Sequence, residues 1–326
     1  MTRRIGFLSV AHMHSYGYAA AITGRPDALI SGVWDPDPNA ASAFAERFGS
    51  RVLDTPEAVV AESDGLIVTS SNTRHADLCI LALEADKPVL CEKPLVTSEA
   101  DGLRMRAAEE SSRARLMTAF PCRYSGAFAR LCDRVRSGEV GAVLGIAATN
   151  HGMCPFGWFV EVEESGGGAM MDHTVHVADL LRVLLEEEPV EVYAQTGNNM
   201  YGCDWEDSAM LHVRFGNGVF ATIDASWSRP KSWKTWGDVK LTVVCERGVL
   251  ELDMFAQALD VFTNGDMRHK VASYGSDLDA GLVTDFVKVM AGGLPAISLT
   301  DGLVASKVAI AGYESAASGA PVSLRN

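Results

Sequence analysis

Up to about Phe120, short apolar runs alternate with stretches in which apolar residues recur at helical spacing. Such runs are typical of buried strands, and the intervening stretches are typical of amphipathic helices. Strands that alternate with helices predict βαβ units and a parallel sheet. The expected strands are Arg3–Val10, Ala28–Trp34, Gly65–Thr69, a run ending at Cys91, and Leu116–Ala119, and the expected helices are Ser15–Thr23, Pro38–Phe48, Pro56–Glu62, Ala76–Ala85 and Ser98–Ser111. We therefore expect a doubly wound α/β domain over residues 1–122.

Beyond that point strand-like runs dominate. Ala209–Phe215 and Val219–Trp227 flank Gly216-Asn217-Gly218, which indicates a hairpin. Because no helix separates these runs, they predict an open, mostly antiparallel sheet. A second pair of strands is expected at Lys240–Cys245 and Val249–Leu252. Three further helices are expected at Phe128–Arg136, Asp279–Met290 and Thr300–Ser318. We expect an α+β domain over residues 123–326.

Composition narrows the class of protein. A chain of 326 residues suggests two domains, and the net charge of −14 argues against nucleic acid or an anionic membrane surface as a partner. No apolar run approaches the ~18 residues of a membrane span. The seven cysteines form no C-x-x-C pair, which indicates reduced thiols, a cytoplasmic location and no structural zinc. The apolar start after two arginines also resembles a short signal peptide, but two histidines interrupt it, so we favour a strand.

The turn after the first expected strand lies where a dinucleotide-binding domain has G-x-G-x-x-G. Its residues are Ser9-Val10-Ala11-His12-Met13-His14, so Ser9, Ala11 and His14 replace the three glycines. An ordinary tight loop is the alternative. Asp35 ends the second expected strand, where an acidic residue bonds the ribose 2′-hydroxyl. A carboxylate there repels a 2′-phosphate, so NAD is favoured over NADP. Asp35 is alternatively a solvated turn residue.

Two more strand ends have polar residues. Ser70, Asn72 and His75 follow one strand, and they are expected in the cofactor crevice or, alternatively, in an Asx turn with a helix cap. Glu92-Lys93-Pro94 follows another. Ligands of open α/β sheets bind outside the carboxyl ends of the strands, which favours a ligand-facing lysine over a surface Lys-Pro turn.

Three glycines, 166–168, precede another expected helix and permit a close backbone approach to a ligand. Asp172 and His176 are four residues apart and so share a face of this helix. Asp179 is placed to orient His176, whereas His173 points away from that face by about 100°. The alternative is a helix with a polar face and one hydrogen-bonded histidine.

A metal site is the competing chemistry. Its ligands would come from His12, His14, Asp172, His173 and His176. No H-E-x-x-H motif or other strong ligand spacing occurs. We therefore expect no metal.

Together these motifs resemble the Gfo/Idh/MocA oxidoreductases, the family of glucose–fructose oxidoreductase and inositol dehydrogenase. The resemblance rests on Glu92-Lys93-Pro94, on Asn72 with His75, and on Asp172-x-x-x-His176 after three glycines. It covers essentially the whole chain. It implies an N-terminal Rossmann domain that binds a nicotinamide cofactor, and a C-terminal α+β domain whose sheet forms homodimer or homotetramer contacts. It also implies a sugar, cyclitol or similar polyol as substrate and a cis peptide bond before Pro94.

The resemblance further implies that Lys93, Asp172 and His176 act on a substrate hydroxyl. The expected cofactor-binding residues are Ser9, Ala11, His12, His14, Asp35, Ser70, Asn72, His75, Glu92 and Lys93, and the expected substrate-binding residues are His151, Trp158, Phe159 and His173. We expect an NAD(P)-dependent dehydrogenase, with NAD preferred. Two alternatives stay open: a redox-neutral enzyme of the glycoside hydrolase or epimerase type that uses NAD transiently, and a non-catalytic NAD-binding sensor.

Overall fold

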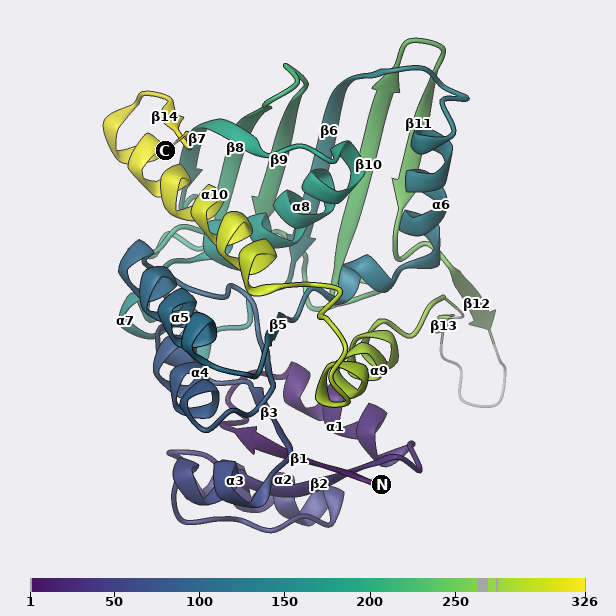
Figure 1. Ribbon diagram of the computed structural model, residues 1–326. Helices are drawn as coiled ribbons and strands as arrows, with labels where there is room; N and C mark the ends of the chain where they lie inside the picture. Colours follow the sequence, from purple (N-terminus) through teal and green to yellow (C-terminus); the bar gives the residue numbers. More distant parts are fainter. Residues whose placement is uncertain (1, 263–268, 274, 326) are drawn as a thin grey trace. The chain divides into compact units, whose positions relative to one another are not determined.

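A parallel sheet of five strands, ordered β2-β1-β3-β4-β5, forms the centre of the N-terminal part of the chain (Figure 1). Its strands are β1 (Arg3–Leu8), β2 (Ala28–Trp34), β3 (Gly65–Val68), β4 (Val89–Cys91) and β5 (Leu116–Thr118). Their apolar side chains are almost completely buried, as expected for a parallel sheet covered on both faces. The strands predicted from the apolar runs are therefore confirmed.

The computed structural model describes residues 2–262, 269–273 and 275–325, and of residues 258–273 only the backbone is described. The chain divides into two compact units. The first consists of Met1–Pro121, Gly157–Gly166 and Asp279–Ser306, and the second of Cys122–Phe156, Gly167–Leu278 and Lys307–Asn326. Two segments thus pack with the first unit although they lie beyond residue 122, the expected end of the first domain.

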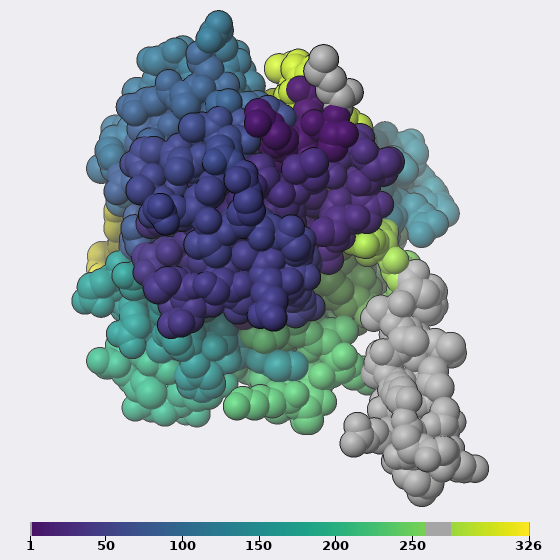
Figure 2. All heavy atoms as spheres, turned by 90° about the horizontal axis from the view of Figure 1, so that it is seen from below, coloured from purple at the N-terminus to yellow at the C-terminus, as the bar shows by residue number. Residues whose placement is uncertain are grey.

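The first unit also contains helices and 3₁₀ turns, of which those before β5 connect its strands. They are α1 (His14–Thr23), α2 (Pro38–Phe48), α3 (Pro56–Glu62), η1 (Asn72–Arg74), α4 (His75–Glu84), α5 (Glu99–Ser111), η3 (Gly157–Val160), α7 (Val162–Ser165) and α9 (Leu278–Met290). Ser98 precedes α5 and accepts a hydrogen bond from the Asp101 N–H, which caps the start of this helix. The yellow-green α9 lies beside the purple N-terminal segment in both Figure 1 and Figure 2. There Arg25 donates a hydrogen bond of 2.7 Å to Thr284.

The second unit contains a seven-stranded sheet with the order β11-β10-β6-β9-β8-β7-β14. Its strands are β6 (Val143–Gly152), β7 (Pro189–Gly197), β8 (Ser208–Phe215), β9 (Phe220–Ser226), β10 (Gly237–Cys245), β11 (Gly248–Asp253) and β14 (Val322–Ser323). All neighbouring pairs are antiparallel except β6 and β9, so the predicted mostly antiparallel sheet is confirmed. The other elements are η2 (Pro121–Tyr124), α6 (Gly126–Arg136), α8 (Ala169–Leu185), and the hairpin of β12 (Ala258–Phe262) and β13 (His269–Ser273). Helix α10 (Leu299–Ser318) belongs to the first unit up to Ser306 and to the second from Lys307.

Helix α8 packs on one face of this sheet (Figure 1). Side chains that point toward it, such as Leu211 and Ile223, are almost completely buried. On the opposite face Met210 and Phe220 are 52% and 49% exposed. All seven cysteines are free. Within the described ranges, no helix combines the length and apolarity that crossing a bilayer would need.

Candidate functional site

The carboxyl ends of β1 to β4 gather most of the predicted cofactor residues at one edge of the first unit's sheet. Strand β1 lies between β2 and β3, so the order of the strands reverses beside β1. In open α/β sheets ligands bind outside the strand ends at this reversal.

The turn after β1 is closed by Asp35. Ser9 has a φ of +67°, a left-handed conformation that favours glycine. The Ser9 hydroxyl and the Val10 N–H each donate a hydrogen bond of 2.7 Å to Asp35 Oδ2. Asp35 Oδ1 accepts another, of 2.8 Å, from the Asp37 N–H. Asp35 therefore holds the glycine-free turn in place, and part of its hydrogen-bonding capacity is used by the fold.

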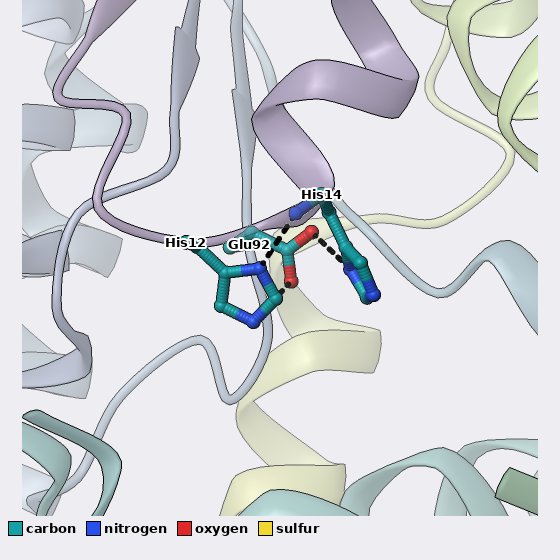
Figure 3. A group of neighbouring side chains, drawn as sticks. All are labelled: His12, His14 and Glu92. Atoms are coloured by element: carbon teal, nitrogen blue, oxygen red, sulfur yellow. Dashed lines mark hydrogen bonds and ion pairs between the residues drawn. The ribbon is translucent and has the colours of Figure 1, made fainter. Parts of the chain in front are cut away.

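A buried carboxylate, Glu92, lies between the side chains of His12 and His14 (Figure 3). His14 Nδ1 is 3.0 Å from Glu92 Oε1, which also accepts a hydrogen bond from the Tyr18 hydroxyl. The Lys93 N–H donates to Oε2 at 2.9 Å. Burial raises the pKa of Glu92, but the positive charges of His14 and Lys93 and the hydrogen bond with His14 outweigh it and hold that pKa well below its usual range. Glu92 is therefore an ionised carboxylate.

The spacing of His12, His14 and Glu92 would suit a metal ion. However, His12 Nδ1 accepts a hydrogen bond of 3.2 Å from the His14 N–H. The proton of a neutral His12 ring is therefore on Nε2, which lies 4.0 Å from Glu92 Oε2. A metal ion bound to Nε2 would displace that proton. Nδ1 could not take up the proton, because it already accepts the hydrogen bond from the His14 N–H. The hydrogen bonds favour a cluster of charges over a metal site.

Asn72 and His75 hold neighbouring segments of the first unit together. His75 Nδ1 is 2.9 Å from the Pro94 carbonyl, and Asn72 Nδ2 donates to the Ser165 carbonyl at 2.8 Å. Burial lowers the pKa of His75, so the ring is neutral with its proton on Nδ1. In the described part of the chain, Asn72 Oδ1 and His75 Nε2 are buried acceptors without a protein donor. Such atoms are suited to a ligand or an ordered water.

Lys93 is 4% exposed at the end of β4, and its peptide bond to Pro94 is cis, as predicted. Ser70 lies after β3, where its hydroxyl donates to the Ser71 carbonyl at 2.9 Å. Trp158 and Phe159 stack on each other at 3.8 Å between ring centroids. Trp158 donates to the Ala11 carbonyl at 3.2 Å, and Phe159 lies 5.3 Å from the His12 ring. The two aromatic residues predicted for a sugar pocket thus pack on the turn after β1.

In the second unit, protein atoms occupy the space beside the glycines before α8. A Cβ on Gly167 would lie 2.1 Å from the Tyr313 hydroxyl, and one on Gly168 would lie 2.2 Å from the Glu206 carbonyl oxygen. The Glu206 carboxylate also accepts hydrogen bonds from the Gly168 and Met170 N–H groups and from Tyr313. These glycines therefore make room for the residues that cap α8, and not for a ligand as we expected.

Asp172 and His176 lie one turn apart on α8, and both are buried. The Trp227 indole donates a hydrogen bond of 3.1 Å to Asp172 Oδ2, and His173 Nε2 lies 3.4 Å from the same oxygen. The prediction that His173 points away from Asp172 is therefore wrong. Asp179, expected beside His176, forms a bidentate ion pair with Arg123.

His151 lies on the sheet face opposite α8. Its neighbour Asn150 faces the helix and donates to the His173 carbonyl at 3.0 Å, and successive side chains of a strand alternate between faces. His151 contacts Asp224 at 3.1 Å and Asp238 at 3.3 Å. Burial lowers the pKa of His151, but these two carboxylates outweigh it and raise the pKa to about 9. The structure does not place His151 beside Asp172.

Comparisons with known proteins match this fold. The oxidoreductase family with an NAD-binding Rossmann fold matches residues 4–120, and the GFO/IDH/MocA C-terminal domain matches residues 128–251. The chain belongs to the GFO/IDH/MocA family of oxidoreductases. It is 31% identical over 222 residues to 1,5-anhydro-D-fructose reductase of Ensifer adhaerens, covering 67% of this chain and 66%, just under two thirds, of that protein. It is 26% identical to myo-inositol 2-dehydrogenase of Thermotoga maritima, covering 93% and 92%. GenD2 from gentamicin A biosynthesis, solved in complex with NAD, has the same fold, with a TM-score of 0.89, 22% identity and coverage of 100% and 97%.

Membership of the GFO/IDH/MocA family confirms the predicted resemblance, the fold class and NAD as the cofactor. Three residues beside the predicted sites were not foreseen. They are Tyr18, Trp227 and Tyr313. Tyr18 follows His14 by four residues on α1, so helical spacing had placed it within reach. The other two come from distant segments, and nothing in their local sequence indicates a contact with α8.

Proposed function

We propose that this family member is a dehydrogenase that transfers a hydride between NAD and a secondary alcohol of a sugar, cyclitol or similar polyol. The arrangement around Asp172 is the observation that supports it most directly. A buried carboxylate is held by the Trp227 indole, lies beside His173, and precedes His176 by one turn of α8. The two named relatives act, by their names, on anhydrofructose and myo-inositol, which are both polyols.

The first unit fits a dinucleotide. Asp35 lies at the end of β2 beside the turn after β1, where the ribose hydroxyls of NAD are expected. Asn72 Oδ1 and His75 Nε2 are buried acceptors suited to hydroxyl or amide donors of a ligand. When bound, NAD supplies the hydride acceptor, and the chain supplies orientation and proton transfer.

The proposed catalytic residues are Lys93, Asp172 and His176. His176 accepts the proton of the substrate hydroxyl, since histidine is the side chain that most often serves as a general base. Lys93 stabilises negative charge that develops on the substrate. Asp172 orients His176, and Trp227 in turn fixes the Asp172 carboxylate.

We also propose a cytoplasmic homodimer or homotetramer that associates through the sheet of the second unit. The free cysteines suit a reducing compartment. On the sheet face opposite α8, Met210, Phe220 and Val244 are 52%, 49% and 42% exposed. Large apolar side chains grouped on one face are typical of an interface between subunits.

A panel of cyclitols and sugars tests the proposed reaction. Purified protein with added NAD should form NADH, detected by its absorbance, with at least one cyclitol or sugar of the panel. Turnover of a substrate by protein that retains NAD, without net formation of NADH, would instead establish the redox-neutral alternative.

A further inference from the structure

The turn after β1 offers few free backbone donors to a pyrophosphate. A glycine-rich turn normally presents several N–H groups at the start of its helix. Here the N–H groups of residues 9–12 and 14–16 all donate within the protein. Those of residues 9–12 donate, in order, to Trp34 O, Asp35 Oδ2, Ser9 Oγ and Thr69 O. Those of residues 14–16 donate, in order, to His12 Nδ1, His12 O and Met13 O. Among the described residues of this turn, Met13 has the one N–H without a protein acceptor. Another group must therefore supply most of the attraction for a pyrophosphate.

His14 is placed to do so. It replaces the third glycine of the usual motif and is the first residue of α1. Its Nδ1 faces Glu92, and Figure 3 shows the other ring nitrogen pointing away from that carboxylate. An ionised carboxylate only accepts hydrogen bonds, so Nδ1 bears a proton and a second proton must bind Nε2. The side chain is 30% exposed, so a protonated ring presents an outward N–H at the helix start.

We infer that a cationic His14, together with the Met13 N–H, binds the pyrophosphate of the dinucleotide in place of the missing glycine-turn donors. The inference rests on the proposed NAD site. A helix N-terminus attracts anions, and a charge-assisted hydrogen bond from an imidazolium is about twice as strong as a neutral one. Glu92, buried behind the ring, holds the imidazolium in one orientation through its Nδ1–H.

The groups that surround His14 favour its charged form. Glu92 at the end of β4 and Asp279 on α9 attract the cation, whereas Lys93 opposes it. The His12 and Tyr18 rings pack against it at 4.4 and 6.1 Å between centroids. Burial lowers the pKa of His14, but the attraction of Glu92 outweighs it, and the pKa lies above its ordinary value. Affinity for the pyrophosphate should therefore decrease as the pH rises through the pKa of His14.

Calorimetric binding of NAD, ADP-ribose and adenosine tests the inference. His14→Gln should weaken NAD and ADP-ribose by about ten- to hundredfold, as expected for one charged hydrogen bond. Adenosine, which has no pyrophosphate, should bind equally well to both proteins. His14→Lys should retain most of the affinity for ADP-ribose. Arg106→Gln, which changes an exposed cationic residue of α5 in the same unit, is the control and should change nothing.

A folded His14→Gln protein that binds ADP-ribose as tightly as wild type would overturn the inference. Because Glu92 is fully buried, His14→Gln is at risk of misfolding. In that case the pH dependence of binding by the wild-type protein provides the test. Its affinity for ADP-ribose, relative to that for adenosine, should decrease as the pH is raised above neutrality. A constant ratio would contradict the role of His14. Wild-type protein that binds adenosine but neither NAD nor ADP-ribose would overturn the proposed cofactor as well.

Discussion

Asp35 combines a structural and a proposed ligand-binding role in one side chain. It accepts hydrogen bonds from Ser9 and Val10 that close the turn after β1. The sequence predicted Asp35 from the position of the ribose but gave no sign that the same carboxylate compensates for the missing first glycine. Substitution of Asp35 should therefore affect both stability and cofactor choice.

Asp35→Ser should reduce the preference for NAD over NADP, because it removes the ribose contact and the repulsion of a 2′-phosphate. It should also lower the free energy of unfolding by about 1–3 kcal/mol, since it removes acceptors of buried donors. Asp37→Ser is the control, because Asp37 caps α2 and serine is also a good N-cap. Titrations with both cofactors, with thermal unfolding, measure the two effects. A wild-type protein that prefers NADP would refute the assignment.

The tautomer of His12 leads to a prediction about metals. Because His12 Nδ1 accepts a hydrogen bond from the His14 backbone, its Nε2 is protonated and is not available as a ligand. Dialysis against a chelator should leave both NAD binding and turnover unchanged. Stoichiometric zinc in elemental analysis, together with loss of activity when the zinc is removed, would show that this hydrogen-bond assignment is wrong.

At the scale of elements, the parallel strands were predictable because they are buried on both faces and consist of continuous apolar runs. Strands β6 and β7 were not predicted. Strand β6 contains Gly145, Ala147 and Ala148, which have low strand propensity, and β7 begins with Pro189. Strand β6 forms because it pairs with β10 on one side and β9 on the other. That pairing is a tertiary effect which the local sequence does not contain.

The candidate site on α8 was only partly predictable, for a similar reason. The spacing of Asp172 and His176 correctly placed both on one helix, but the direction of His173 was wrong. Helical geometry gives the direction in which a Cα–Cβ bond leaves the helix, whereas the rotamer decides where a long ring ends. Trp227 lies 55 residues after Asp172, and only the folded sheet brings its indole to that carboxylate.

The cluster of His151, Asp224 and Asp238 joins three neighbouring strands, β6, β9 and β10, and Arg229 also pairs with Asp238. One guanidinium offsets one of the two carboxylates, so a protonated His151 makes the cluster neutral. The pKa of His151 is about 9 in the folded protein and about 6.5 in the unfolded chain. The ion pairs of protonated His151 therefore stabilise the fold fully below about pH 6.5, and this stabilisation is lost as the pH rises through about 9.

Chemical denaturation at several pH values tests this effect. Between pH 6.5 and 9.5 the wild type should lose about 1–3 kcal/mol of unfolding free energy through His151. This loss is smaller than the pKa shift alone implies, because Asp224 is partly exposed and solvent screens its charge. His151→Gln should remove most of that dependence, whereas His212→Gln should keep it. The same pH dependence in wild type and His151→Gln would contradict the assigned charge.

At the scale of the whole molecule, the chain divides its proposed chemistry between two compact units. Lys93 and the predicted cofactor residues belong to the first unit, and Asp172 and His176 belong to the second. The overall charge of −14 disfavours anionic ligands, so an NAD site depends on local donors and cations such as those near α1. Residues of both units are needed for turnover in this account, but only those of the first are needed for NAD binding.

The most direct test is the rate of NADH formation by wild type, His176→Ala and Lys93→Ala at saturating NAD and polyol, with the affinity for NAD measured in parallel. Loss of a general base typically costs about 10²–10⁴-fold in rate. His176→Ala should therefore lose about that much turnover while it binds NAD normally, Lys93→Ala should lose at least as much, and the control Arg106→Ala, at an exposed residue of α5, should match wild type. A folded, NAD-binding His176→Ala protein with near wild-type turnover would contradict the account.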